Sequence, residues 1–134
     1  MKITEHFNTE ELTRTDTGLE NKPDPTSFSN LYDLCFEVLE PVRKLLSDYS
    51  KKIIRIKINS GYRSEEVNKA VKGKRNSQHL QGQAADFVPV GIMITSAFKL
   101  IKESNIPFDQ MILYNNFIHI SHSRNPRRQP IVKK

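Results

Sequence analysis

The stretch from residue 76 to 87 carries two side chains that can do chemistry, the imidazole of His79 and the carboxylate of Asp86. They lie seven residues apart, with Gly82 between them and two small alanines beside the carboxylate. Imidazole nitrogens and carboxylate oxygens both bind divalent metals such as Zn²⁺, and a glycine lets the backbone turn tightly. The pattern therefore predicts part of a metal site, for which a third ligand is needed.

The best candidate for the third ligand is His119, near the end of the chain. If its neighbours Ile118 and Ile120 face the core of a sheet, His119 points to the opposite face, where a site can be built. Two imidazoles and one carboxylate suit Zn²⁺ with a fourth position open to water, and water bound to zinc is a nucleophile near neutral pH, so hydrolysis is the implied reaction. The alternative is chance pairing, because a single histidine is more often a satisfied polar residue than a ligand.

The spacing of apolar residues predicts the elements that must position these side chains. Helices are predicted over residues 4–14, 27–48, 64–72 and 95–104. Strands are predicted over residues 53–58, 84–88, 110–114 and 117–121. Pro41 lacks an N–H, which predicts a kink or break in the long helix, and Asn115 and Asn116 tolerate the positive φ of a tight hairpin turn. This order predicts an α+β fold with a small, mainly antiparallel sheet and helices packed on it.

At 134 residues the chain is expected to form a single domain, residues 1–134. We divide it into an N-terminal helix and loop (1–26), a core (27–122) and a basic C-terminal tail (123–134). The tail carries five lysines and arginines and no acidic residue. Two interpretations of the tail stay open: it helps adhesion to an anionic surface, or it is a solvated, frayed end.

The net charge of +6 and the isoelectric point near 9.5 indicate an anionic partner, either nucleic acid or a polyanionic cell wall. We expect no nucleic-acid binding, because no interleaved aromatic residues or reading motif accompany the charge. No apolar run is long enough for a membrane span, and the N-terminus lacks the apolar stretch of a signal peptide, which predicts a protein made in the cytoplasm. The single cysteine, Cys35, cannot form an internal disulfide and is interpreted as a buried small hydrophobe.

Four ordered blocks of sequence carry a resemblance to a known family. They are Ser60–Ser64, Ser77–Asp86, Phe108–Gln110 and Phe117–Ser121. In this order they resemble the motifs of the zinc D-alanyl-D-alanine carboxypeptidase family, which includes phage endolysins and shares its fold with the hedgehog signalling domain. The resemblance covers residues 28–122, and the stretch from Phe7 to Gly18 resembles the lead-in of small phage and prophage members.

The resemblance implies that His79, Asp86 and His119 bind zinc and that the fold is of the hedgehog/DD-peptidase type. It also implies an activity: hydrolysis of a peptide bond in the peptidoglycan stem, as a D-alanyl-D-alanine carboxypeptidase or an L-alanyl-D-glutamate endopeptidase. The expected partner is the stem peptide, reached on the cell wall after release from the cytoplasm. We expect the chain to act as a monomer.

Two further residues take roles from the resemblance. Arg63 matches the family's arginine, which is suited to holding a carbonyl or carboxylate and stabilising an oxyanion; the alternative is a structural ion pair with a surface carboxylate. Ser77 matches a family serine that orients the substrate or the ligand loop, and its alternative is a simple turn residue.

The general base is the point at which the sequence departs from the family. Relatives carry a Glu or Asp, in several of them three residues before the last histidine, and here that position is Asn116, whose amide cannot act as a base at neutral pH. Asp109, or an acid distant in sequence, is one candidate for the role, and Tyr114 as a hydrogen-bond donor is another. The remaining alternative is a catalytically weak or inactive zinc domain that binds wall peptides or belongs to a phage particle.

Overall fold

The computed structural model describes residues 1–133 and has an α+β architecture, as predicted. The main sheet consists of β3 (Arg55–Ser60), β4 (Ala84–Val90), β5 (Gln110–Leu113), β6 (Ile118–Ser121) and β7 (Gln129–Val132). These strands lie in the spatial order β3-β4-β6-β5-β7. All neighbours are antiparallel except β5 and β7, which are parallel, so the sheet is mixed.

The central pair of strands, β4 and β6, sets the register on which the site depends. Asp86 lies directly opposite His119 across this antiparallel pair, so the two side chains share one face of the sheet. Ala85 and Phe87 on either side of Asp86 point into the core and are fully buried. The alternation predicted around residues 118–120 is therefore present and directs the polar side chains away from the core.

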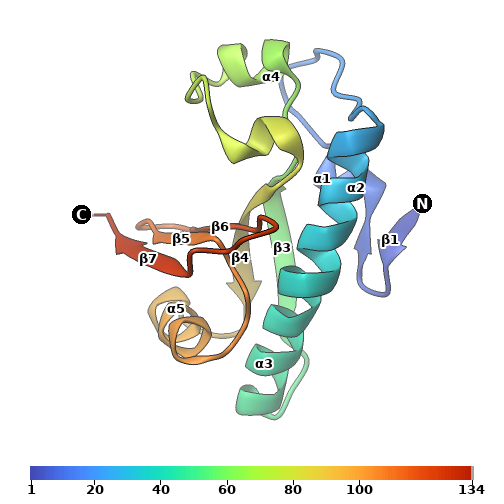
Figure 1. The fold of residues 1–134 in the computed structure, drawn as a ribbon. Helices are drawn as coiled ribbons and strands as arrows, with labels where there is room; N and C mark the ends of the chain where they lie inside the picture. The colour runs from blue at the N-terminus through green and yellow to red at the C-terminus, as the bar shows by residue number, and fades with distance from the viewer. Residues whose placement is uncertain (134) are drawn as a thin grey trace.

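The long helical segment packs its apolar stripe on the other face of the sheet (Figure 1). It comprises α2 (Pro25–Leu34), a π-helical turn η1 (Cys35–Leu39) and α3 (Glu40–Ser50). The helix begins two residues earlier than predicted, because the Asp24 side chain accepts a hydrogen bond from the backbone N–H of Ser27. The predicted irregularity takes the form of the π-turn, which ends two residues before Pro41, whose missing N–H cannot continue the regular ladder.

The N-terminal segment differs from the helix predicted over residues 4–14. Residues Lys2–Thr4 (β1) and Phe7–Asn8 (β2) form a small antiparallel hairpin, and only Thr9–Leu12 (α1) is helical. Asn8 caps this short helix in a capping box with Glu11, which fixes its start at residue 9. The backbone groups before the cap are satisfied by hairpin pairing instead.

Three further helical segments complete the fold. They are α4 (Glu65–Ala70), the 3-10 helix η2 (Gln78–Gln81) and α5 (Ile94–Glu103). The Ser64 side chain caps α4, whose buried residues are Val67 and Asn68, whereas Val71 after it is exposed. The sequence predicts a cap at Thr95 or Ser96 for α5, and this is wrong, since the helix starts at residue 94 without a side-chain cap.

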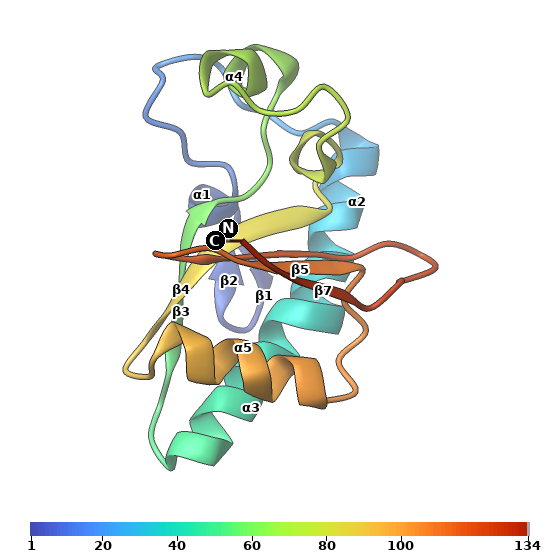
Figure 2. The same ribbon diagram turned by 90° about the vertical axis from the view of Figure 1, so that its left-hand side faces the viewer.

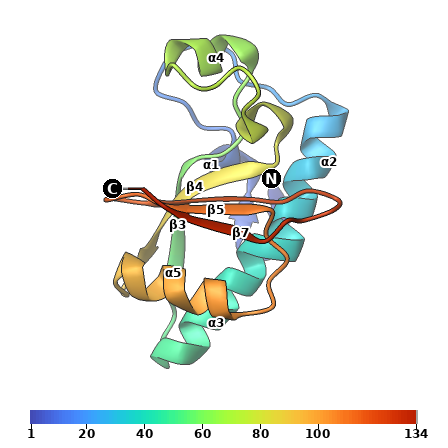
Figure 3. The ribbon, with the colours of Figure 1, turned by 60° about the vertical axis from the view of Figure 1, so that its left-hand side comes forward.

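The segment with α4 and η2 and the helix α5 lie on opposite sides of strands β5, β6 and β7 (Figures 2 and 3). Residues far apart in the sequence thus meet above the sheet, where η2 contacts β4. None of the helices formed by residues 1–133 has both the length and the apolar character that a membrane crossing requires.

The basic segment after residue 122 is not a frayed end along its whole length. Residues 129–132 form β7 and extend the sheet beside β5, with Gln129 opposite Gln110 and Ile131 opposite Ile112. Lys134 lies outside the described residues. The boundary predicted at residue 123 therefore does not mark the end of the fold.

Candidate metal centre

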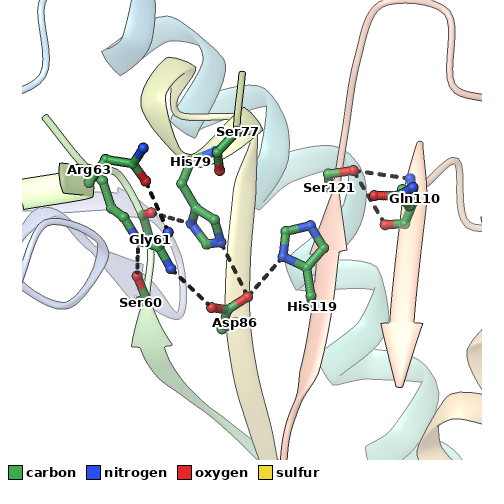
Figure 4. Close-up of polar contacts among 10 residues, drawn as sticks. Ser60, Gly61, Arg63, Ser77, His79, Asp86, Gln110, His119 and Ser121 are labelled. Carbon is green, nitrogen blue, oxygen red and sulfur yellow. Dashed lines mark hydrogen bonds and ion pairs between the residues drawn. The ribbon is translucent and has the colours of Figure 1, made fainter. Parts of the chain in front are cut away.

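The three residues expected to bind metal come together from three different elements (Figure 4). His79 lies on η2, Asp86 on β4 and His119 on β6. The carboxylate oxygen Asp86 Oδ1 lies 3.2 Å from His79 Nε2 and 2.9 Å from His119 Nδ1. One candidate ligand atom from each residue lies within 4.8 Å of the others, so the group can hold a metal ion.

The orientation of His79 is set by its second ring nitrogen. Nδ1 lies 2.7 Å from the backbone oxygen of Gly61, and the side chain is almost fully buried. A carbonyl can only accept, so Nδ1 carries the proton and the lone pair of Nε2 points toward Asp86. This is the tautomer that a histidine needs to bind zinc through Nε2. The two-imidazole, one-carboxylate donor set and its orientation therefore fit zinc.

Asp86 is held as a carboxylate by its neighbours. Burial raises the pKa of Asp86, but its short contacts with the imidazoles of His119 and His79 outweigh this effect and leave the pKa below its ordinary value. The second oxygen, Oδ2, lies 3.5 Å from Arg63 Nη2. The charged form, which is the one that binds a metal, is thus favoured.

Arg63 stands at the edge of this cluster and is held by two more contacts. Its Nε donates to Ser60 Oγ at 3.2 Å, and its Nη1 donates to Asn68 Oδ1 at 3.2 Å. The backbone N–H of Arg63 also donates to the carbonyl of His79 at 3.0 Å. Its acidic contact is Asp86 and not a surface carboxylate, so the alternative of a surface ion pair does not describe its position.

The cluster opens into a cleft of about 480 Å³. The cationic side chains that line it are Arg63, Lys74 and Arg127, of which the sequence analysis singled out only the first. Asp86 is the only carboxylate residue lining the cleft in the described part of the chain. No acid distant in sequence therefore enters the cleft from residues 1–133.

Ser77 lines the cleft and also caps η2. Its Oγ accepts a hydrogen bond from the backbone N–H of His79 at 3.1 Å. The residue is thus a turn former and, through that turn, an anchor of the ligand loop. Both interpretations given to it from the sequence are compatible with this geometry.

Asp109, a candidate base from the sequence, does not line the cleft. Its carboxylate is buried and accepts hydrogen bonds from Arg127 and from the side chain of Gln78. Burial raises the pKa of Asp109, but the hydrogen bonds from Arg127 outweigh it and the pKa is lowered. A carboxylate engaged in this way is poorly suited to take a proton in the cleft.

Tyr114 does line the cleft, whereas Asn116 is exposed at the hairpin turn and is not among the cleft residues. The backbone N–H of Tyr114 donates to the carbonyl of Phe117, and the two rings stack with centroids 4.6 Å apart. The turn therefore directs position 114, and not position 116, toward the metal ligands. Of the two hairpin positions, Tyr114 is the one that the sequence analysis names as a candidate donor.

The site combines one buried and one half-buried imidazole, a carboxylate and an arginine at the wall of an open cleft, which is the composition of a metal-dependent hydrolase centre. The family model described as Peptidase M15 matches residues 5–121, and the chain belongs to this family. The family consists of zinc-dependent metallopeptidases and indicates, at a coarse level, a peptidoglycan-type substrate. Comparison with individual curated proteins gives no match.

Proposed function

We propose that the chain is a zinc metallopeptidase that hydrolyses a peptide bond of the peptidoglycan stem, either D-alanyl-D-alanine or L-alanyl-D-glutamate. The observation that carries this proposal is the convergence of His79 Nε2 and His119 Nδ1 on one oxygen of Asp86 at the wall of a cleft. The chain acts as a monomeric single domain of the phage or prophage lysis type and reaches the wall after release.

His79, Asp86 and His119 would hold the zinc, which would supply Lewis-acid chemistry at the wall of the cleft. The protein contributes the fixed charge of Arg63, whose Nε and Nη1 are occupied by Ser60 and Asn68. Its guanidinium is therefore preorganised at the cleft wall, where it stabilises negative charge as it develops on the carbonyl oxygen.

Tyr114 lines the cleft and is the side chain to which we assign a part in proton transfer. A neutral phenol donates a hydrogen bond but is a poor base near neutral pH. Tyr114 therefore stabilises the developing charge or the leaving amine as a donor, and the proton of the attacking water passes to solvent. This division of roles supports slow hydrolysis that speeds up as pH rises.

The basic C-terminal segment supports adhesion to the anionic wall only in part. Arg127 and Arg128 are engaged in internal hydrogen bonds, so Arg124 and Lys133, both exposed, remain to meet wall polymers. Such exposed cations act over roughly a Debye length, about 10 Å at 0.1 M salt. The adhesion is accordingly salt-sensitive and secondary to binding in the cleft.

Digestion of purified peptidoglycan by the zinc-loaded protein tests the proposal. Mass spectrometry of the products distinguishes the two bonds, because carboxypeptidase action releases free alanine and endopeptidase action creates a new glutamate N-terminus. His79→Ala and Asp86→Ala should abolish cleavage while retaining the far-ultraviolet circular dichroism of the fold. His122→Ala is the matched control, since His122 lies outside the cleft residues. If the folded, zinc-loaded wild type leaves peptidoglycan intact, the proposal is wrong.

A second candidate function is a zinc domain that binds wall peptides without cleaving them. It is favoured by one observation: apart from the ligand Asp86, no carboxylate residue lines the cleft in residues 1–133. This candidate predicts saturable binding of stem peptides that depends on zinc, with no product after prolonged incubation at alkaline pH. Product that accumulates with time would exclude it.

A further inference from the structure

Asp109 is the meeting point of three segments that are far apart in the sequence. Its Oδ1 accepts from the backbone N–H of Arg127 at 2.9 Å and from Arg127 Nε at 3.1 Å. Its Oδ2 accepts from Arg127 Nη2 at 3.0 Å and from Gln78 Nε2 at 3.1 Å. Each carboxylate oxygen thus has two donors, and the side chain of Asp109 is only 5% exposed.

The arginine side of this contact is fixed by the backbone of the residues that follow it. The backbone N–H of Arg128 donates to the carbonyl of Phe108, and that of Gln129 donates to the carbonyl of Asp109, both at 3.0 Å. The guanidinium of Arg128 lies over the ring of Phe108, with 4.6 Å between its carbon and the ring centroid. The C-terminal segment is therefore attached to the start of β5 on both sides of Asp109.

The glutamine that contacts Asp109 lies next to a candidate metal ligand in the sequence. Gln78 is the first residue of η2, and the next residue along the chain is His79. The amide of Gln78 joins this 3-10 helix to the start of β5 through the side chain of Asp109. The position and tilt of η2 determine where the imidazole of His79 lies. This hydrogen bond therefore restrains a candidate metal ligand, although Gln78 and Asp109 are not ligands themselves.

We propose that Arg127 is a positioning residue for the metal centre, acting through Asp109 and Gln78 on the helix that carries His79. Arg127 lies beyond residue 121, where the family match ends, so the matched region does not assign it this role. The two-pronged guanidinium orients the carboxylate in a way that a single ammonium cannot. With the carboxylate fixed, Oδ2 presents a defined acceptor to Gln78.

The inference rests on the proposed metal site, and it makes a specific claim about metal affinity. Replacing residues that support metal ligands typically weakens metal binding by about 10- to 100-fold. We expect Gln78→Ala and Arg127→Ala each to weaken zinc binding by about tenfold, and the double variant to be no weaker than either single one. Arg127→Lys should recover only part of the loss, because lysine offers a single charged group.

The test measures zinc affinity by competition with a chelator, together with the visible absorption spectrum of the cobalt-substituted protein. Arg128→Ala is the matched control: it removes a neighbouring arginine that donates to the backbone carbonyls of Ile106 and Ser104 and not to Asp109. This control should lower thermal stability and leave zinc affinity and the cobalt spectrum unchanged. Gln78→Ala decides the matter if Arg127→Ala fails to fold, because it leaves the arginine–carboxylate pair intact.

Each result has one meaning. Weaker zinc binding and an altered cobalt spectrum in Gln78→Ala and Arg127→Ala, with Arg128→Ala unaffected, support the inference. Unchanged affinity in the folded Gln78→Ala variant, or an equal loss in Arg128→Ala, overturns it and leaves the proposed function standing. A wild type that binds no zinc overturns the proposed function and this inference together.

Discussion

The Nδ1 atom of His79 lies 2.7 Å from the carbonyl oxygen of Gly61, and this glycine is pressed against the N-terminal helix. A Cβ atom at position 61 would lie 2.3 Å from the carbonyl oxygen of Leu12, and the next residue, Tyr62, donates its backbone N–H to that same oxygen at 2.7 Å. The N-terminal segment therefore braces the loop that orients a candidate metal ligand.

Gly61→Ala tests this brace. The added methyl group cannot be accommodated without moving backbone, so we expect a loss of about 1–3 kcal/mol in the free energy of unfolding, as for other overpacked sites. The carbonyl that orients His79 moves with it, and zinc affinity should fall. Denaturant unfolding and chelator competition measure the two effects.

Gly18→Ala serves as the control for that variant, since a Cβ at position 18 meets nothing within 4 Å. Its backbone φ of +78° still disfavours alanine, at a cost of about 1–2 kcal/mol. Zinc affinity should be unchanged in Gly18→Ala. Equal zinc affinities in the two variants would contradict the role given to Gly61.

Zinc itself should stabilise the fold. A ligand that binds only the folded state adds about 2.7 kcal/mol when its free concentration is 100 times its dissociation constant. We expect zinc to raise the melting temperature of the wild type, a chelator to reverse the shift, and Asp86→Ala to lose it. His122→Ala should keep the full shift, and a shift that survives in Asp86→Ala would place the metal elsewhere.

The hairpin geometry yields a gain-of-function prediction. Tyr114 lines the cleft and Asn116 does not, so a carboxylate introduced at position 114 is the one that can accept a proton from water. We expect Tyr114→Glu to raise peptidoglycan hydrolysis at neutral pH and Asn116→Glu to leave it unchanged. A positioned general base contributes about 10²- to 10⁴-fold, which bounds the gain. Faster hydrolysis in Asn116→Glu alone would contradict the assignment.

The sequence predicted the site better than it predicted the surroundings of the site. The grouping of His79, Asp86 and His119 was predicted because strand alternation around His119 is local and the ordered motifs are specific. The sequence names Tyr114 as one candidate donor but does not decide where its side chain lies, because a count along the chain does not give the side-chain directions at a hairpin turn. The contacts of Asp109 were missed since its partner, Arg127, lies on a segment that the sequence analysis treated as a tail.

The strand β7 is a part of the fold that the sequence analysis did not predict. Its four residues include Pro130, which argues against a strand unless the strand lies at a sheet edge. Pairing with β5 is fixed by non-local hydrogen bonds, including that from Lys133 to Leu113. The N-terminal hairpin was likewise hidden, because β1 and β2 have only three and two residues.

Cys35 gives a prediction on reactivity. The thiol is fully buried, and burial raises its pKa to about 12. The thiolate is the reactive form, so the native protein should react slowly with a disulfide reagent at pH 8 and quickly once it is unfolded in guanidinium. Rapid, stoichiometric reaction of the native protein would show that α2 and η1 open readily around this residue.

The pair of Asp109 and Arg127 gives a pH dependence whose sign follows from the lowered pKa of Asp109. A carboxyl group with a lower pKa in the folded than in the unfolded state stabilises the fold above its unfolded pKa, about 3.9 for Asp, and loses this contribution as pH falls through the folded pKa. Asp109→Asn should therefore be less stable than the wild type at pH 7, and the difference should shrink below about pH 4. Urea unfolding in the presence of a chelator, from pH 7 to pH 3, keeps metal release out of the comparison. Asp16→Asn, an exposed loop variant, should track the wild type throughout, and a wild-type advantage over Asp109→Asn that stays constant down to pH 3 would mean that the charge of Asp109 does not stabilise the fold.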